Sequence, residues 1–390
     1  MALKQVCSPE QCSGCFACMS ICPKGAIHQV LNKLGEEKPA IDPEKCISCG
    51  LCVSTCPVNS NQDMRRAEFC YAAWSKFGKD IEKSSSGGIA AVLSRKMLED
   101  GGIVYGSVSR DSKVLHERID SVDGIELTRG SKYVISDMKS CFSRIGVDIN
   151  AGKKVLFIGT PCQTAAVKSV IGKHKNNLYT VDLICHGTPP FTYLKEHLDR
   201  HLSEKKWDSV SFRSKNAYLM RVFHSGTLVY EKPAADDLYY SAFLDSMIFR
   251  GNCYTCRYAC PERVGDLTIG DFWGIDRSKL HASHTGKISL ILPNSPKGNA
   301  LIESCRDNLN LNQLPLEDAM NPEQGNLLHP SVPHTERALF EKLYPQYGFY
   351  GALKRTQFGK KIIRRKYAQM VRSSFVYRAI RNVLKKNLYQ

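Results

Sequence analysis

Eight of the 17 cysteines in this chain of 390 residues repeat one spacing twice near its N-terminus. Each copy reads C-x2-C-x2-C-x3-C-P, with thiols at Cys12, Cys15, Cys18 and Cys22 in the first copy and at Cys46, Cys49, Cys52 and Cys56 in the second. Thiolates at this spacing hold 4Fe-4S clusters, because three lie on a tight loop around one cluster while the fourth begins a helix and reaches the other cluster. The crossing predicts one cluster at Cys12, Cys15, Cys18 and Cys56 and a second at Cys46, Cys49, Cys52 and Cys22.

A zinc site is the alternative interpretation of these cysteines. Zinc ligands usually come as two pairs of thiols or imidazoles, whereas four cysteines so crowded are typical of iron-sulfur proteins. The pattern indicates a small, bacterial-type two-cluster ferredoxin domain, which we expect over residues 1–65. Such a domain passes electrons singly from one cluster to the other.

A further group of cysteines follows apolar segments of the chain. Cys162 comes after the predicted strand 154–158, and Cys185 comes after the predicted strand 179–184. If these strands are neighbours in one sheet, both thiols emerge at the same edge. A later C-x2-C pair is half of a metal site and needs two more thiolates. We therefore predict a third 4Fe-4S cluster at Cys162, Cys185, Cys253 and Cys256, with Cys260 as a substitute ligand.

The place of Cys162 at the start of a helix has its own consequence. The positive end of the helix dipole lowers the pKa of a thiol and favours the thiolate. A buried structural cysteine is the alternative. The cysteines without such a context are expected to be ordinary core or surface residues; they are Cys7, Cys70, Cys141 and Cys305.

A loop rich in serine and glycine precedes an apolar helical pattern that runs to Leu98. Hydroxyls and unobstructed backbone N–H groups at a helix N-terminus form an anion site, which suits the phosphates of a cofactor. An ordinary N-cap and turn would have the same composition. The loop consists of Lys83, Ser84, Ser85, Ser86, Gly87 and Gly88.

The elements that must position these residues alternate between strand and helix patterns. Strands are expected at 71–74, 103–109, 154–158, 179–184, 209–212, 220–230, 267–269 and 288–292, and helices at 88–98, 141–149, 236–249 and after Cys162. The fold class is therefore a mixed α/β domain over residues 66–340. Because a single core stops growing near roughly 250–300 residues, a chain of this length is expected to hold more than one domain.

The net charge of +16 is concentrated in the last segment, a basic helical tail expected over residues 341–390. From Lys354 onward there are 12 Lys or Arg residues and no Asp or Glu. A basic amphipathic helix can lie on anionic lipid or dock on an acidic partner, and it can equally pack its apolar face on the body of the protein. No nucleic-acid-binding module is recognisable, so a nucleic-acid partner is not expected.

The same sequence predicts a cytoplasmic protein. The first 15 residues contain no apolar signal segment, and no apolar run approaches the roughly 18 residues needed to span a bilayer. Paired ferredoxin spacing requires reduced thiolates, which are maintained in a reducing compartment. If the basic tail binds lipid, the protein is peripheral at the inner face of the membrane.

Beyond single motifs, the chain resembles the beta subunit of coenzyme F-420 hydrogenase and dehydrogenase over about residues 70–300. The resemblance rests on the order of six motifs, which are Ser85-Ser86-Gly87-Gly88, Arg129-Gly130-Ser131-Lys132-Tyr133-Val134, Gly159-Thr160-Pro161-Cys162-Gln163, Asp182-Leu183-Ile184-Cys185-His186-Gly187, Ser211-Phe212-Arg213-Ser214-Lys215 and the segment from Cys253 to Gly274. It implies an FAD flavoprotein with its own 4Fe-4S cluster that moves a hydride between a deazaflavin or another substrate and the flavin. With the N-terminal domain, the expected cofactors are three 4Fe-4S clusters and FAD.

The resemblance also implies roles for single residues. It assigns Ser85, Ser86, Gly87 and Gly88 to the FAD phosphates, and Lys132, Tyr133, Thr160 and Gln163 to the neighbourhood of the flavin ring. Asp266 and Asp271 are implied to shape the site, although either can simply cap a turn. Lys132 and His186 are the candidate catalytic residues, with His186 a proton donor or a core histidine.

The partners that follow are a small-molecule hydride donor or acceptor and a ferredoxin or similar redox protein. Two other functions stay open. Bacterial relatives often lack the deazaflavin and lie near genes for cell-surface polysaccharide synthesis, which suggests a ferredoxin-fed reductase in polysaccharide metabolism. A non-catalytic electron-transfer subunit without flavin is the other alternative.

Overall fold

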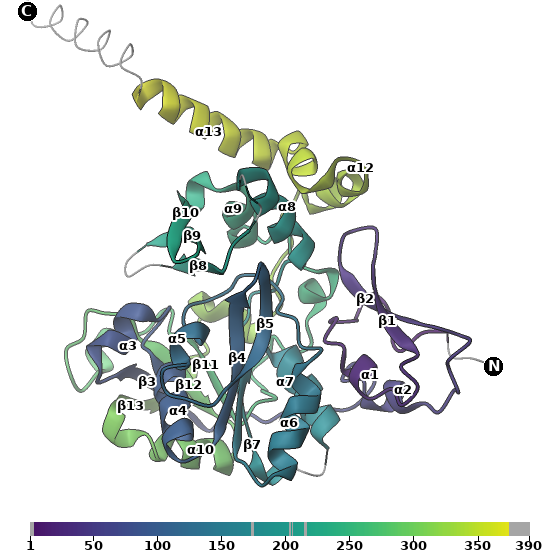
Figure 1. Ribbon diagram of the computed structural model, residues 1–390. Helices are drawn as coiled ribbons and strands as arrows, with labels where there is room; N and C mark the ends of the chain where they lie inside the picture. Colours follow the sequence, from purple (N-terminus) through teal and green to yellow (C-terminus); the bar gives the residue numbers. More distant parts are fainter. Residues whose placement is uncertain (1–3, 173–174, 203, 205, 214–216, 374–390) are drawn as a thin grey trace, which may run out of the picture.

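The computed structural model describes residues 4–172, 175–202, 204, 206–213 and 217–373. Figure 1 shows an N-terminal module beside a larger α/β body, a smaller lobe above that body, and one helix that projects from the lobe. Two residues of the motifs that carry the resemblance, Ser214 and Lys215, lie outside the described residues, as does the part of the expected tail beyond residue 373. None of the described helices is long and apolar enough to cross a membrane.

The N-terminal module (residues 4–60) contains two short helices and one hairpin. Helix α1 is Ala17–Ser20, strands β1 and β2 are Ile27–Leu31 and Glu37–Ile41, and helix α2 is Leu51–Thr55. The strands pair antiparallel. Both helices begin directly after a residue with positive φ, Phe16 before α1 and Gly50 before α2. Each cysteine loop therefore turns sharply into a short helix that carries the third cysteine of its motif, and the fourth cysteine follows the helix rather than beginning it.

The α/β body is built on one eight-stranded sheet in the order β13-β3-β12-β11-β7-β6-β4-β5. Strands β4, β6, β7 and β11 are parallel, and the remaining strands pair antiparallel with their neighbours. The strands are β3 Phe69–Ser75, β4 Ile103–Arg110, β5 Lys113–Ile119, β6 Val155–Gly159, β7 Leu178–Leu183, β11 Leu267–Asp271, β12 Ser289–Pro293 and β13 Leu309–Pro315. The predicted mixed α/β fold class is confirmed.

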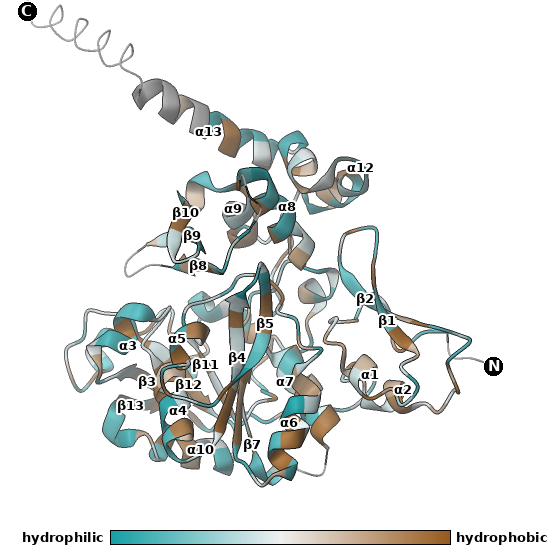
Figure 2. Cartoon of the chain, in the orientation of Figure 1, coloured by the Kyte–Doolittle hydropathy of each residue, from teal (hydrophilic) through white to brown (hydrophobic). Residues whose placement is uncertain are grey.

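Helices cover both faces of this sheet. Because side chains alternate along a strand, Val155 and Phe157 of β6 pack on one face and Leu156 packs on the other. Helices α6 (Cys141–Asn150) and α7 (Pro161–Ile171) cover the first face, while α4 (Ile89–Glu99) and α10 (Pro296–Glu303) cover the second. Figure 2 shows the apolar colour concentrated in the strands of the sheet.

The small lobe is formed by β8–β10, α8, α9 and α12. Its elements are β8 Ser209–Arg213, β9 Tyr218–His224, β10 Thr227–Pro233, α8 Phe191–His201, α9 Leu238–Leu244 and α12 Arg337–Arg355. Phe349, Leu353 and Phe358 belong to its buried core. The first part of the expected tail therefore packs as core, and α13 (Gln357–Ser373) begins at its edge and projects away.

The remaining short elements connect these layers. They are the helices α3 Gly78–Lys83, α5 Ile125–Thr128 and α11 Gly325–Leu328, and the 3-10 turns η1 Lys175–Asn177, η2 Ala234–Asp236, η3 Gly251–Thr255, η4 Arg277–Lys279, η5 Arg306–Asn308, η6 Leu316–Asp318 and η7 Pro322–Gln324.

The structure differs from the sequence expectations at two turns. The expected strand 220–230 is a hairpin, because Ser225 and Gly226 both adopt positive φ and reverse the chain. The expected helix 236–249 ends at Leu244, since Ser246 adopts a left-handed conformation.

Candidate iron-sulfur and flavin sites

The first quartet of thiols is Cys12, Cys15, Cys18 and Cys56. Burial raises the pKa of the Cys15 thiol to about 12, and Cys12 and Cys56 lie close enough to raise it further. Cys18 is likewise buried beside the other three thiols. The fourth ligand comes from the second sequence motif, as the crossed pattern requires. The four thiols, donated by two loops, fit a 4Fe-4S cluster.

Cys7 adds a fifth thiol that the sequence interpretation did not place near a cluster. Hydrogen bonds to the thiols of Cys12 and Cys56 raise the pKa of Cys7. The same contacts lower the pKa of Cys12 to about 6 and that of Cys56 to about 7. The only sequence signal is its position five residues before the first motif.

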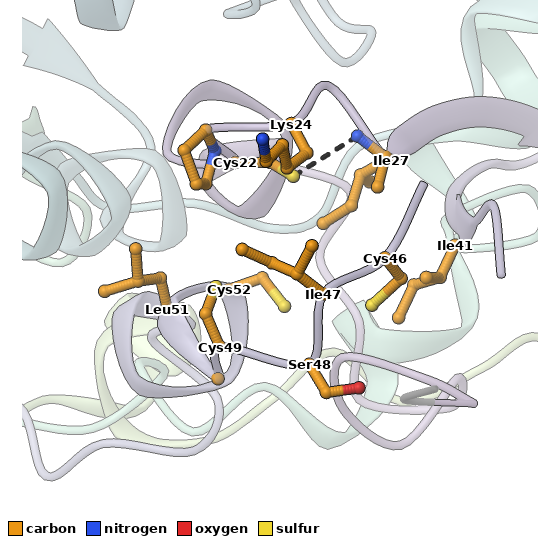
Figure 3. A pocket seen from close by; sticks show the side chains of 13 residues that line it. Cys22, Lys24, Ile27, Ile41, Cys46, Ile47, Ser48, Cys49, Leu51 and Cys52 are labelled. Atoms are coloured by element: carbon orange, nitrogen blue, oxygen red, sulfur yellow. Dashed lines mark hydrogen bonds between the residues drawn. The ribbon is translucent and has the colours of Figure 1, made fainter. Parts of the chain in front are cut away.

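The second quartet is Cys22, Cys46, Cys49 and Cys52. These residues line one hollow at the surface of the N-terminal module, together with Ile27, Ile41, Ile47 and Leu51. Figure 3 shows the sulfur atoms of Cys46 and Cys52 turned toward the hollow, with Cys22 opposite them. The Cys22 sulfur accepts a hydrogen bond of 3.3 Å from the Ala26 N–H. Cys49 is exposed, so this quartet lies at the outer face of the module.

The crossed arrangement makes a direct prediction. Replacing Cys56 with alanine, in a Cys7→Ala background so that the fifth thiol does not substitute, should remove the first cluster and about four iron atoms. Replacing Cys22 with alanine should remove the second cluster instead. Iron analysis and EPR spectra of the reduced proteins measure both, with Cys7→Ala alone as the control that keeps both clusters. Loss in the opposite order would show that the ligands do not cross.

The third quartet comes from three separate parts of the α/β body. Cys162 lies in the first turn of α7, directly after β6, and Cys185 lies two residues beyond β7. Because β6 and β7 are parallel neighbours, both thiols lie at one end of the sheet, as expected. Cys253 lies in η3, and Cys256 follows that turn. Burial raises the pKa of Cys185 well above its ordinary value, and Cys253, Cys162 and Cys256 lie close enough to add to the effect.

A buried ion pair holds these segments together. The Asp182 carboxylate at the end of β7 accepts hydrogen bonds from Arg263 at 2.8 and 3.2 Å. It also accepts from the Thr268 hydroxyl and the Gly265 N–H, each at 2.8 Å. Both charged side chains are at most 1% exposed. The network ties the strand that ends before Cys185 to the segment that follows Cys256.

Two details of the third quartet differ from the expectation. Burial raises the pKa of the Cys162 thiol, although the Thr160 hydroxyl at 3.2 Å opposes this rise, so the helix position alone does not make it a thiolate. The Cys260 thiol donates to the carbonyls of Arg257 and Glu262. Among the described residues, no three His, Cys, Asp or Glu side chains are placed to hold a single metal ion.

The first and third quartets are joined through packed side chains. Ala17 and Cys15 of the N-terminal module pack into the core around Phe157 of β6. Tyr258 is buried between the two quartets: burial raises its pKa, and the thiols of Cys162 and Cys15 contribute to the rise. The first and third quartets are therefore neighbours, while the second quartet lies at the outer face of the N-terminal module.

A cavity of about 320 Å³ lies at the same end of the sheet and reaches the third quartet, since Cys185 lines it. Its size is typical of a small-molecule site. The residues expected near the flavin that line it are Ser85, Ser86, Gly88, Lys132, Tyr133, Thr160, Gln163 and His186. The structure thus brings together residues from separate motifs of the chain.

One end of the cavity is suited to phosphate. It is lined by the serine-rich loop, the first turn of α4 and Arg129. Arg129 donates to Asp80 and Glu126, each at 2.8 Å, but its Nη1 is buried without a hydrogen-bond partner among the described residues. An orphaned guanidinium nitrogen beside a helix N-terminus is a donor set for an anion. Arg129 belongs to one of the six motifs, although no role of its own was predicted for it.

Gly87 does not line the cavity, in contrast to the expected phosphate contact. Its N–H donates to the Ser289 hydroxyl at 2.9 Å, and a Cβ here would lie 2.6 Å from the Ala73 carbonyl oxygen. Gly87 is needed for close packing of the loop on β3 and β12. Gly88, with φ of +87°, does line the cavity.

The two candidate catalytic residues both line the cavity and both have lowered pKa values. Burial lowers the pKa of Lys132 to about 7, and its Nζ donates to the carbonyls of Leu127, Thr128 and Arg129. Burial also lowers the pKa of His186, and the charge of Arg213 lowers it further. A neutral imidazole at neutral pH follows for His186.

Thr160 and Gln163 belong to a chain of hydrogen bonds that crosses the cavity wall. The Gln163 amide accepts from the Thr160 hydroxyl at 3.0 Å and donates to the Ser136 hydroxyl at 2.9 Å. Ser136 lies 2.9 Å from His116 Nδ1, and His116 Nε2 donates to the Ile158 carbonyl at 3.0 Å. Burial lowers the pKa of His116 to about 4, so the ring is neutral and the chain keeps a fixed orientation.

The two predicted site-shaping carboxylates lie in different places. Asp271 lines the cavity and accepts from Arg213 at 2.7 Å. Arg213 also donates to the Tyr133 hydroxyl at 2.6 Å and to the Ser85 carbonyl. Asp266 accepts from the Thr180 hydroxyl at 2.7 Å at the other end of β11 and has a structural role.

Comparisons with known proteins address the family. Residues 152–319 match the family described as the C terminus of the beta subunit of coenzyme F420 hydrogenase/dehydrogenase, and residues 11–60 match the 4Fe-4S dicluster domain. Among solved structures the chain is similar to a chain of the F420-reducing NiFe hydrogenase complex from Methanosarcina barkeri, at 18% identity over 76% of this chain and 94% of that one, with a TM-score of 0.42. No curated protein matches the sequence.

The family matches agree with the cysteine chemistry and indicate an iron-sulfur oxidoreductase that transfers electrons. The resemblance found in the sequence is confirmed: the chain carries the C-terminal region typical of beta subunits in the coenzyme F420 hydrogenase/dehydrogenase family and, ahead of it, a 4Fe-4S dicluster domain.

Proposed function

We propose that the protein is an iron-sulfur flavoprotein that exchanges a hydride between a small substrate and FAD, and single electrons between FAD and a redox partner. The observation that carries the proposal is the position of Cys185. It lines the cavity and also belongs to the third quartet, whose neighbour is the first quartet. A cavity for a two-electron cofactor and a line of one-electron sites are thereby adjacent.

When bound, FAD exchanges electrons as a hydride or one at a time, and the 4Fe-4S clusters take them singly. Arg129 and the N–H groups around Gly88 bind the phosphates in this proposal. The cavity also presents Tyr133, Phe243 and Ile158, which suit an apolar ring. The hydrogen-bonded chain from Thr160 to His116 keeps that end of the wall rigid.

Lys132 and His186 are assigned to proton handling beside the ring. The pKa of Lys132, lowered to about 7, suits a group that exchanges protons near neutral pH, whereas the lowered pKa of His186 keeps its imidazole neutral and able to accept a proton. Lys132 also caps the carbonyls at the end of α5, so its position is fixed by hydrogen bonds.

The second quartet would hold the cluster that exchanges electrons with a partner in this proposal. Cys49 is exposed, and Ile47 beside it is 58% exposed. An apolar rim around a cluster site allows a ferredoxin or similar redox protein to approach closely. We place the reaction in the cytoplasm. The exposed cations Lys360, Lys361 and Arg364 on the projecting α13 are available for contact with an anionic membrane surface, whereas Arg365 pairs with Asp236 at 3.6 Å.

Anaerobic purification with iron, sulfide and flavin assays tests the proposal. The intact protein should contain about twelve iron atoms and close to one FAD released without covalent attachment. Adding bulk to the cavity wall with Ala90→Trp should lower FAD content and leave the iron content unchanged, because Ala90 lines the cavity away from every quartet. Val147→Trp, at an exposed position on α6, is the matched control.

Two results would count against the function. Iron without flavin would favour a non-catalytic electron-transfer subunit. Iron and flavin with no turnover of a deazaflavin, but with ferredoxin-dependent reduction of a sugar intermediate, would favour the role in polysaccharide metabolism.

A further inference from the structure

Arg250 is a buried arginine at the junction between the N-terminal module and the α/β body. The residue is 2% exposed and directly precedes η3, the turn that contains Cys253. Its backbone N–H donates to the Thr188 carbonyl at 3.0 Å, and its carbonyl accepts from the Cys253 N–H at 2.9 Å. The backbone of Arg250 is thus fixed next to the third quartet.

The side chain of Arg250 reaches the loop of the first quartet. Its Nη1 donates to the carbonyl of Ser13, which lies between Cys12 and Gly14. A Cβ at Gly14 would stand only 2.4 Å from Nη2, so this loop closes tightly on the guanidinium, and Gly14 has a φ of +59°. Nη2 is buried and has no hydrogen-bond partner among the described residues.

The charge of Arg250 lies between the segments that carry the first and third quartets. On one side its Nη1 contacts the carbonyl of Ser13, the residue after Cys12. On the other side its own carbonyl accepts a hydrogen bond from the N–H of Cys253. An arginine side chain keeps its positive charge in proteins, and a charge acts strongly where little water screens it.

The acidic groups around Arg250 have other partners. Glu36 accepts from the Gly251 N–H at 2.7 Å and pairs with Lys38 at 3.1 Å. Burial would raise the pKa of Glu36, but the charges of Lys38 and Arg250 hold it below its ordinary value. Glu37 is the other carboxyl near Arg250; burial raises its pKa, while Lys139 opposes the rise. These two carboxylates therefore neutralise the positive charge of the Arg250 guanidinium only in part.

We propose that Arg250 jointly sets the reduction potentials of the clusters in the first and third quartets. The proposal rests on the proposed function, since it requires both clusters. Reduction adds one electron to a cluster, so a fixed positive charge favours the reduced form. The Nη2 hydrogens, which have no partner among the described residues, would be available to a cluster sulfur, and such hydrogen bonds tune the potential. The second quartet is affected less, because Cys49 is exposed to water.

Redox titration with dithionite, followed by EPR, tests this role in the full-length holoprotein. Arg250→Met keeps much of the side-chain volume and removes the charge, whereas Arg250→Lys keeps the charge. Met should lower the reduction equilibrium constants of the first and third clusters about tenfold, a shift of about 59 mV for a one-electron couple. The reduction potentials of Arg250→Lys should stay closer to those of the wild type. Arg221→Gln, which removes an exposed charge in the small lobe, is the matched control.

The outcomes separate this proposal from the proposed function. Absence of the third cluster from the wild-type protein would reject the proposed function. Three intact clusters with unchanged potentials in Arg250→Met would reject the inference alone, as would an equal shift in Met and Lys. If Arg250→Met loses iron, the neutral variant Arg250→Gln replaces it in the titration. Iron loss from both neutral variants, but not from Arg250→Lys, would assign Arg250 a structural role instead.

Discussion

Replacing Cys185 with serine is expected to remove about four of roughly twelve iron atoms and to stop electron exchange between the flavin and the N-terminal module. The reason is that Cys185 is the thiol shared by the cavity wall and the third quartet. Losing even an outer-shell partner costs a metal site about 10–100-fold in affinity, and losing a ligand costs more. Iron analysis and stopped-flow reduction of the clusters after flavin reduction measure the two effects.

Cys260 supplies the matched control for this experiment. It lies four residues beyond Cys256, but its thiol contacts the carbonyls of Arg257 and Glu262. Cys260→Ser should therefore retain all the iron and normal electron exchange. If Cys260→Ser removes the third cluster and Cys185→Ser does not, the fourth ligand is Cys260 and not Cys185.

Replacing Asp182 with alanine is expected to lower the free energy of unfolding by about 3–5 kcal/mol. The substitution leaves the Arg263 guanidinium, 1% exposed, without the carboxylate that neutralises it. It also removes the acceptor of the Gly265 N–H and the Thr268 hydroxyl. Urea unfolding under anaerobic conditions measures the change, and the third cluster should be lost at lower urea than the other two.

The exposed pair between Glu303 and Arg306 provides the comparison. Its side chains are 39% and 56% exposed, and Glu303→Ala should change the free energy of unfolding by less than about 1 kcal/mol. Replacing Asp182 and Arg263 together with apolar residues should cost less than Asp182→Ala alone, because no unpaired charge remains buried. An equal loss of unfolding free energy in all three variants would show that the buried pair contributes no more to stability than the exposed pair.

Cysteine spacing allowed the N-terminal quartets to be predicted because each motif is local in sequence. The third quartet was also predictable, since two apolar runs that end in cysteine imply neighbouring parallel strands, as β6 and β7 are. Strand β5 was not predicted, because only part of its face is buried and polar residues such as His116 and Glu117 interrupt the pattern. Strand β13 was not predicted for the same reason, because Asn310 and Asn312 interrupt its apolar pattern.

Long-range contacts account for what the sequence could not reveal. Nothing local distinguishes Arg250 from other arginines, because its role depends on the Ser13 carbonyl 237 residues away. Gly87 was interpreted as a phosphate contact, whereas the neighbouring strand backbone explains it. The tail was expected to begin near residue 341, but Phe349 and Phe358 complete an aromatic core formed with α8 and α9.

The separation of the quartets along the chain has a consequence for how the protein is made. The thiols of the first two quartets all lie within the first 56 residues, so a short nascent chain already contains both sets. The third quartet gathers only after β6, β7 and η3 have been synthesised and the sheet has closed around them. Chains fold from the N-terminus during synthesis, and distant segments meet late. On the proposed ligand assignment, we therefore expect iron loading to be ordered in time: the thiols of the N-terminal module become available first, and the thiols beside the cavity become available only in a nearly finished protein.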